Sequence, residues 1–302
     1  MVSQTAYLDH ASTSPTRKSS VDAMLPFFSK NFGNASSPYL QGRESRKAID
    51  NSKDKIASLM ECDSREIIFT SGGTEAIIIA LVGAALGNRH RGNHLITSAF
   101  EHHAVHAVFD FLRDEMGFET EFFGVDENGI IRLDELERKV SNDTVLISAM
   151  AVNNEIGTIQ PINEIVELCA GKNILVHSDF VQAIGKIPLS LGKIGVDIAN
   201  VSGHKFGGPK GIGFLYMKSG TYLKPICSSS HEFGIRAGTE NVGGIAGIAS
   251  GLEEAIRETP ELENRLTGFR KRILDCIFSV APDAKINGNP DKSVVSIINL
   301  RM

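Results

Sequence analysis

Cysteines are few in this sequence, and their spacing does not match a redox or disulfide motif. The 302 residues include four cysteines that lie far apart, with no CxxC pair among Cys62, Cys169, Cys227 and Cys276. This usage is typical of reduced thiols in a cytoplasmic protein. We also expect no secretory signal, because Tyr7-Leu8-Asp9-His10 interrupts any apolar run near the N-terminus.

Long apolar runs and excess positive charge are also missing. No apolar run approaches the length needed to span a bilayer. The formal net charge is −5, which gives no reason to expect a nucleic-acid-binding surface. Apolar content of 42% and charged content of 22% are typical of a globular protein with one large domain or two ordinary ones. We therefore expect a soluble cytoplasmic protein without a membrane or nucleic-acid partner.

Short β-branched runs alternate with helical patterns along most of the chain. We expect strands over residues 66–70, 94–100, 118–125, 144–152, 174–177 and 197–201, and from Gly211 onward. We expect helices over residues 21–28, 43–60, 75–86, 103–115, 133–140 and 161–170. This order predicts an α/β fold: a three-layer α/β/α large domain with a mostly parallel sheet.

Polar or ionisable side chains follow five of the expected strands. They are Ser71 to Thr74, Glu101 to His103, Asn153 to Glu155, Asp179 with Gln182, and Ser202 to Lys205. Ligands of parallel α/β sheets bind at the carboxyl ends of the strands. A single polar strand end could arise by chance, whereas five of them together indicate a ligand-binding site.

The most informative strand end is the segment VSGHKFGGPKG, which carries Lys205 between two apolar runs. A lysine in such a loop can lose hydration, which lowers its pKa and frees the amine to attack a carbonyl. A solvated surface lysine is the ordinary alternative. A phosphate loop of the GxxxxGK[ST] type is nearly spelled but fails, because Pro209 follows the second glycine and no Ser or Thr follows Lys210.

A pyridine cofactor with an aldehyde, a phenolic oxygen and a phosphate suits these strand ends. Lys205 can hold the aldehyde as a Schiff base, and Asp179 can keep the ring nitrogen protonated. His102 can stack on the ring, and amides of Gln182 and Asn154 can bond the phenolic oxygen. The phosphate can be held by the helix start and neighbouring side chains at Gly73, Thr74, Ser202 and His204.

Each of these residues also has a structural interpretation. Asp179 with Gln182 fits a capping box, and Asn153-Asn154 fits a plain turn. His102, His103 and His106 suggest a metal cluster, but HExxH is absent and adjacent histidines diverge on a helix or strand. The ordered placement at successive strand ends favours the cofactor site, and we expect no metal.

Eight segments spread over most of the chain resemble the cysteine desulfurases of the NifS/IscS type, in the class-V aminotransferase branch of fold-type I pyridoxal-phosphate enzymes. The segments are YLDHASTSP, FGNASSPYLQGRESR, IIFTSGGTEA, ITSAFEHHAV, VNNEIGTIQPI, HSDFVQAIGK, VSGHKFGGPKGIGFLY and HEFGIRAGTENV. The resemblance implies pyridoxal 5'-phosphate as the cofactor. It also implies that Lys205 and His102 are catalytic, with Lys205 binding the cofactor and moving the substrate's proton.

The resemblance implies the remaining site residues and the partners as well. Gly73, Thr74, Ser202 and His204 match phosphate-side positions, and Asp179, Gln182 and Asn154 match cofactor contacts, with Asn154 also near the substrate carboxylate. Thr239 matches a residue that reaches the phosphate of the partner subunit, which implies a homodimer. The reaction implied takes sulfur from L-cysteine, giving L-alanine and a persulfide for iron–sulfur cluster or thio-cofactor assembly, with a sulfur-acceptor or scaffold protein as a further partner.

The resemblance also predicts the domain organisation. Residues 1–15 would form an N-terminal segment packing with the small domain, residues 16–255 the large cofactor-binding domain, and residues 256–302 an incomplete small α+β C-terminal domain. The family's nucleophilic cysteine and carboxylate-binding arginine normally lie beyond the position matching Met302, so we expect impaired turnover of this form. Cys227 is the one cysteine expected in a loop, and burial is the expectation for most of the others.

Two alternatives remain open. A related lyase acting on selenocysteine or cysteine sulfinate would share the cofactor site. A non-catalytic paralogue would keep the fold as a dimerising partner. A second departure from the family is Ser228-Ser229-Ser230, where glycines are common, since serine adopts a positive φ poorly.

Overall fold

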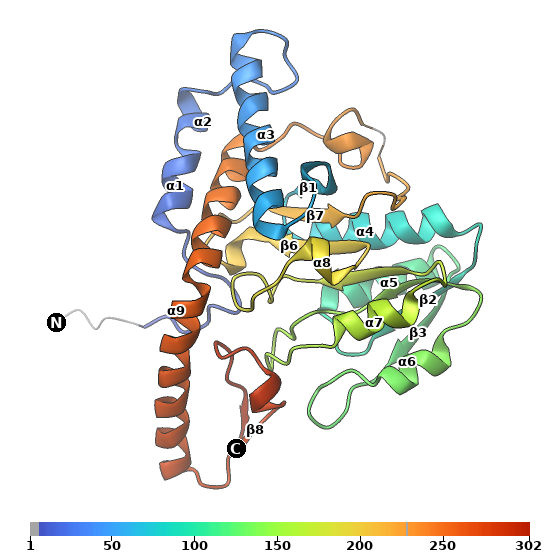
Figure 1. Cartoon of the computed structure of the whole chain (residues 1–302), viewed down its shortest axis with the longest axis vertical. Coiled ribbons are helices and arrows are strands. Elements are labelled where there is room, and N and C mark those ends of the chain that lie inside the picture. The colour runs from blue at the N-terminus through green and yellow to red at the C-terminus, as the bar shows by residue number, and fades with distance from the viewer. Residues whose placement is uncertain (1–5, 228) are drawn as a thin grey trace, which may run out of the picture.

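One seven-stranded sheet forms the centre of the computed structural model, which describes residues 6–227 and 229–302 (Figure 1). Ser228 of the expected serine departure lies outside the described residues. The strands are β1 (Ile67–Thr70), β2 (His94–Ser98), β3 (Glu119–Phe123), β4 (Thr144–Ser148), β5 (Leu175–Asp179), β6 (Ile198–Ser202) and β7 (Gly213–Met217). Their order is β1-β7-β6-β5-β4-β2-β3, and β7 runs antiparallel to both of its neighbours while the other pairs are parallel. The predicted α/β fold with a mostly parallel sheet is confirmed.

Helices cover both faces of this sheet (Figure 1). One face packs against α4 (Gly73–Asn88) and α5 (His103–Asp114). The other packs against α3 (Leu40–Met60), α6 (Leu133–Lys139), α7 (Ile162–Cys169), α8 (Leu191–Ile194) and α9 (Val242–Val280). The sheet is therefore the middle layer of three, with helices packed on both of its faces.

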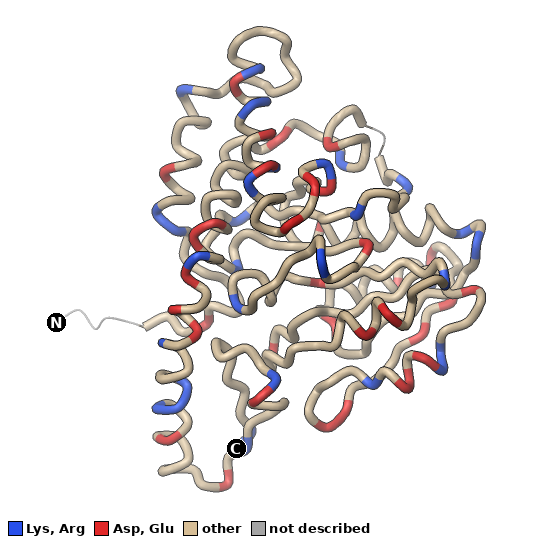
Figure 2. The backbone as a smooth tube through the Cα atoms, viewed as in Figure 1, with Lys and Arg blue, Asp and Glu red and all other residues tan. Residues whose placement is uncertain are grey.

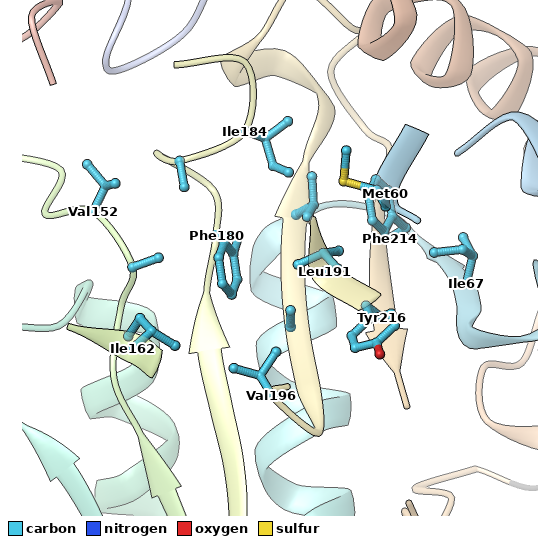
Figure 3. Packing of buried hydrophobic residues seen from close by; sticks show 14 of the residues in the cluster. Met60, Ile67, Val152, Ile162, Phe180, Ile184, Leu191, Val196, Phe214 and Tyr216 are labelled. Atoms are coloured by element: carbon cyan, nitrogen blue, oxygen red, sulfur yellow. The ribbon is translucent and has the colours of Figure 1, made fainter. Parts of the chain in front are cut away.

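Alternation of side chains along the strands produces the two apolar clusters. Ile67 and Phe69 join the cluster on the α3 side, whereas Ile68 joins the cluster on the α4 side. Phe214 and Tyr216 of β7 lie in the same cluster as Met60 of α3 (Figure 3). Burying each such large apolar side chain stabilises the fold by roughly 1.5–3 kcal/mol.

The N-terminal helices differ from the single helix predicted over residues 21–28. Two consecutive helices, α1 (Lys18–Met24) and α2 (Pro26–Ser29), occupy this region and pack on α9. Pro26 has no backbone N–H and a fixed φ, so it begins a new helix more readily than it continues one. Arg17, just before α1, donates to Glu254 and Glu258 of α9 at 3.0 and 2.5 Å.

The long helix α9 was not predicted from the sequence. It runs from Val242 to Val280 across the proposed boundary at 255/256, with Pro260 inside it. Beyond it, β8 (Lys285–Ile286) and β9 (Leu300–Arg301) pair as a small antiparallel sheet beside its end (Figure 1). The division into large and small domains stays a prediction, with one continuous helix linking the two regions.

Charged side chains are intermixed rather than segregated on the long helices. Figure 2 shows acidic and basic residues interspersed along α3 and α9.

Among the helices of residues 6–227 and 229–302, none has the length and apolar character needed to cross a lipid bilayer.

Candidate functional site

The carboxyl ends of β1, β2, β4, β5 and β6 surround one cavity of about 480 Å³, the main cavity. Nine of the ten predicted cofactor residues line it: Gly73, Thr74, His102, Asn154, Asp179, Gln182, Ser202, His204 and Lys205. They come from five separate loops that the parallel strands bring to the same edge. The strand-end reasoning therefore located a cavity, although the roles assigned to the residues stay predictions.

Lys205 lies where three cavities meet. It ends the short 3-10 turn η2 (Gly203–Lys205) directly after β6, and it also lines a second cavity of about 590 Å³ and a third of about 560 Å³. Its Nζ donates to the backbone carbonyls of Ala11 at 2.7 Å and Ser12 at 2.8 Å. Burial lowers the pKa of Lys205, while the nearby carboxylate of Asp179 works in the opposite direction. A partly desolvated amine of this kind is suited to attack a carbonyl.

Asp179 ends β5 as a buried carboxyl group with 4% of its surface exposed. Its Oδ1 accepts a hydrogen bond from the Val181 N–H at 2.8 Å. Burial raises the pKa of Asp179 to about 6, although the Val181 N–H, Asn200 and Lys205 lower it. The predicted alternative of a capping box is not formed, because the Gln182 side chain donates to Ala11 O instead of reaching back. A buried carboxyl without a full ionic partner is suited to receive a cationic ring nitrogen.

His102 presents a neutral ring to the cavity. It is the N-cap of α5, and its Nδ1 accepts from the Ala104 N–H at 3.2 Å. Burial, followed by the charges of His103 and Lys205, lowers the pKa of His102 to about 4. The third histidine, His106, contacts Ser98 O at 3.1 Å through Nε2. Within residues 6–227 and 229–302, no group of three His, Cys, Asp or Glu side chains is placed to hold a metal ion.

The start of α4 forms one end of the main cavity. The helix begins at Gly73, two residues earlier than predicted, and its N-cap Gly72 supplies no side-chain cap. A Cβ atom at Gly73 would lie 3.2 Å from Val181 Cγ2 and 3.4 Å from Ser202 Cβ, so a side chain would crowd this wall. The His204 Nδ1 lies 3.0 Å from Thr13 Oγ1. Uncapped amides beside hydroxyl and imidazole groups are typical of a phosphate site.

Thr239 does not join the other nine residues. It lines a separate cavity of about 50 Å³ together with Ser71, Gly211, Glu232 and Arg236. Its predicted contact is with the phosphate of a partner subunit, so its role stays a prediction. Asn154 does line the main cavity, and its Nδ2 donates to Glu155 Oε1 at 2.7 Å.

Sequence reasoning assigned no role to four residues of this region. The carbonyls of Ala11 and Ser12 come from a segment interpreted as irregular chain, and no side-chain pattern predicts such a contact. Glu101 Oε1 accepts a hydrogen bond from the Met150 N–H at 2.7 Å, and burial raises the pKa of Glu101 to about 8. Lys186 contacts Gln182, and burial lowers the pKa of Lys186 to about 7. Glu101 stood among the strand-end residues but received no role.

None of the four cysteines lines the main cavity. Burial raises the pKa of Cys62 and of Cys169 to about 12. Cys227 is exposed in a loop, as expected. Of the other three, only Cys169 is buried, while Cys62 is partly buried and Cys276 is exposed on α9, so the expectation of burial for most of them is wrong. Cys276 is exposed because the buried residues of α9 are concentrated nearer its start.

Known proteins resemble the whole described fold. The family described as "Aminotransferase class-V" matches residues 6–300. The "Cysteine desulfurase IscS" of Clostridium botulinum is 40% identical over 288 residues, which are 95% of this chain and 72% of that protein. A solved structure titled "NIFS-LIKE PROTEIN" has 35% identity and a TM-score of 0.92, over 96% of this chain and 80% of that one. Another, titled "SspA in complex with cysteine", has 30% identity and a TM-score of 0.87, over 98% and 83%.

These matches extend over nearly the entire chain and agree with the site geometry. The similar structures carry the same fold at identities of 30% and above. The chain therefore belongs to the class-V aminotransferase family, in its branch of cysteine desulfurases of the NifS/IscS type.

Proposed function

We propose that this protein is a pyridoxal-phosphate-dependent cysteine desulfurase. It would remove sulfur from L-cysteine, leaving L-alanine, and supply a persulfide for iron–sulfur cluster or thio-cofactor assembly. The observation that supports this most directly is the half-buried amine of Lys205, with its lowered pKa, in the same cavity as the buried carboxyl of Asp179.

The residues present fit the cofactor of this family. The main cavity joins an amine at Lys205, a carboxyl at Asp179 and a neutral imidazole at His102. The wall at Gly73 would be tightened by any Cβ, and it lies next to helix amides without a side-chain cap. An amine, an acid, a flat ring and an anion site are the four features that pyridoxal phosphate requires. When bound, the cofactor withdraws electrons from the substrate's α-carbon.

The chain's own residues divide the remaining tasks. Lys205 would hold the cofactor's carbon and later move the proton at the substrate's α-carbon. The carbonyls of Ala11 and Ser12 orient its Nζ, and burial favours the neutral amine. Asp179 would hold the proton on the ring nitrogen, and His102 would cover one ring face without adding charge.

The substrate would enter beside Asn154, which lines both the main and the second cavity. The similar structure solved in complex with cysteine supports this substrate class. The described residues at the main cavity supply chemistry at the α-carbon, and the thiol that accepts sulfur does not lie among them.

We also propose the finer partner assignments on the same basis. They are a homodimer in which Thr239 reaches the partner's phosphate site, a sulfur-acceptor or scaffold protein, and a cytoplasmic location.

Spectroscopy of Lys205 variants tests the proposal. The protein saturated with pyridoxal phosphate should show the visible band of lysine-bound cofactor, L-cysteine should perturb it, and Lys205→Ala should abolish it. Lys210→Ala is the matched control, because Lys210 lines the same cavity but carries no role here. A band retained in Lys205→Ala, or absent from the unaltered protein, would refute the assignment.

A further inference from the structure

A second lysine lies behind the main cavity and contacts one of its walls. Lys186 follows β5 by a short turn and lines the third cavity but not the main one. Its Nζ donates to Gln182 Oε1. Gln182 is 3% exposed and lines the main cavity, so it separates Lys186 from the proposed cofactor.

Hydrogen bonds connect the two lysines through this glutamine. Gln182 Nε2 donates to Ala11 O at 2.9 Å, and Lys205 Nζ donates to the same carbonyl at 2.7 Å. The chain of contacts therefore runs from Lys186 to Gln182, to Ala11 and to Lys205.

The N–H groups of the Lys186 amine decide which end of the amide faces which way. The amine keeps N–H donors whether it is protonated or neutral, and its donation to Gln182 Oε1 uses the one acceptor oxygen of an amide that otherwise offers a donor nitrogen. Because Oε1 accepts from Lys186, Nε2 is the end that faces Ala11 O, the carbonyl that also accepts from Lys205 Nζ. The second N–H of Nε2 remains available after the bond to Ala11. A flipped amide would turn its N–H groups toward the Lys186 amine and its oxygen toward Ala11 O, and the two hydrogen bonds of the observed orientation would be lost.

Ionisable side chains surround Lys186 on the third cavity. His10, Arg17, Lys205, Glu263 and Arg265 also line the third cavity. Arg17 is occupied by Glu254 and Glu258. Among the ion pairs of the described residues, none joins Lys186 to a carboxylate. The amide oxygen of Gln182 is the side-chain acceptor that Lys186 uses.

We propose that Lys186 is a positioning residue that fixes the amide of Gln182, so that this wall of the cavity offers an N–H donor rather than a carbonyl oxygen. The inference rests on the proposed function, because the acceptor for that N–H is the phenolic oxygen of bound pyridoxal phosphate. A donor stabilises a phenolate, so the cofactor retains its dissociable proton less strongly when the donor is present.

A double-mutant cycle on the visible spectrum separates positioning from a charge effect. The pH midpoint of the visible band is measured for the cofactor-loaded protein, Lys186→Met, Gln182→Ala and the double variant. Lys186→Met should raise the midpoint by about one unit, a tenfold change in proton affinity. In the Gln182→Ala background the same substitution should produce little further shift, since the amide through which it acts is gone.

Three further variants complete the test. Lys186→Arg keeps a donor to Gln182 Oε1, so its pH midpoint should equal that of the unaltered protein. Gln182→Glu keeps an acceptor for Lys186 but has no side-chain N–H, so it should raise the pH midpoint as Lys186→Met does. It therefore tests the same donor if Lys186→Met folds poorly. Lys193→Met, at an exposed ion pair with Glu61, is the matched control and should change nothing.

Equal shifts in both backgrounds would overturn the inference, because Lys186 would then act through its charge alone. An unchanged midpoint in Lys186→Met would also overturn it, while the band itself and its loss in Lys205→Ala would leave the proposed function standing. Absence of the band from the unaltered protein would overturn the proposed function and, with it, this role.

Discussion

Replacing Lys53 by methionine should lower the free energy of unfolding by about 3–5 kcal/mol, because the change leaves the buried carboxylate of Glu232 without its positively charged partner. Lys53 lies on α3, and its Nζ donates to Glu232 Oε2 at 2.8 Å. Only 8% of the Lys53 side chain and 2% of the Glu232 side chain are exposed. The pair connects α3 to the segment that carries Thr239.

The size of the expected loss in unfolding free energy depends on the hydrogen bonds that Glu232 would still accept without Lys53. Its Oε2 also accepts the Phe69 N–H at 2.8 Å, on the strand that forms one edge of the sheet. Its Oε1 is buried with no hydrogen-bond partner among the described residues. Lys53→Met therefore leaves one N–H to stabilise a buried charge. It also removes the ammonium 4.3 Å from the centre of the Phe233 ring, a contact worth about 0.5–2 kcal/mol.

Urea unfolding followed by far-UV circular dichroism measures the effect, since the sequence contains no tryptophan for fluorescence. The double variant Lys53→Met, Glu232→Gln should recover most of the loss, because a glutamine oxygen can still accept the Phe69 N–H without a buried charge. The matched control is Lys193→Met, whose partner Glu61 is half exposed, and it should change the free energy of unfolding far less, because surface ion pairs contribute little. A Lys53→Met loss no larger than that of the control would refute the reasoning.

Two other predictions concern protonation and assembly. Burial raises the pKa of Glu101 to about 8 from an ordinary value of 4.5, so the folded state binds more protons than the unfolded state between these values. Its contribution to stability is thus present at low pH and falls by up to about 1.4 kcal/mol per pH unit as pH rises through this window. Glu101→Gln should flatten the decline of unfolding free energy between pH 5 and pH 8, and identical slopes in both proteins would contradict the assignment. Sedimentation of the protein should give twice the 32.7 kDa chain mass, as the proposed homodimer requires, and a mass of one chain would contradict it.

Local patterns predicted the sheet and most of the cavity. The β-branched runs and helical periods are properties of neighbouring residues, so β1 to β7 and helices α3 to α7 could be anticipated to within a few residues, whereas the short helix α8 was not predicted. Asp179 and Lys205 stand directly after strands, and parallel strands bring their carboxyl ends to one edge regardless of loop detail. Helix α9 escaped prediction because four glycines in its first half and Pro260 inside it are poor helix formers, and packing against α1 and α3 outweighs them.

The sequence by itself determined the α/β class, the strand ends and the residue types gathered there, because these depend on spacing along the chain. Only the tertiary structure decided which hydrogen-bond partners and which surroundings those residues have. The carbonyls of Ala11 and Ser12 orient Lys205 across about 190 positions of sequence, and Lys186 reaches Gln182 from behind the cavity. Burial then set the proton affinities of Asp179 and Glu101, since desolvation depends on the packed surroundings of a group and not on its neighbours in the chain.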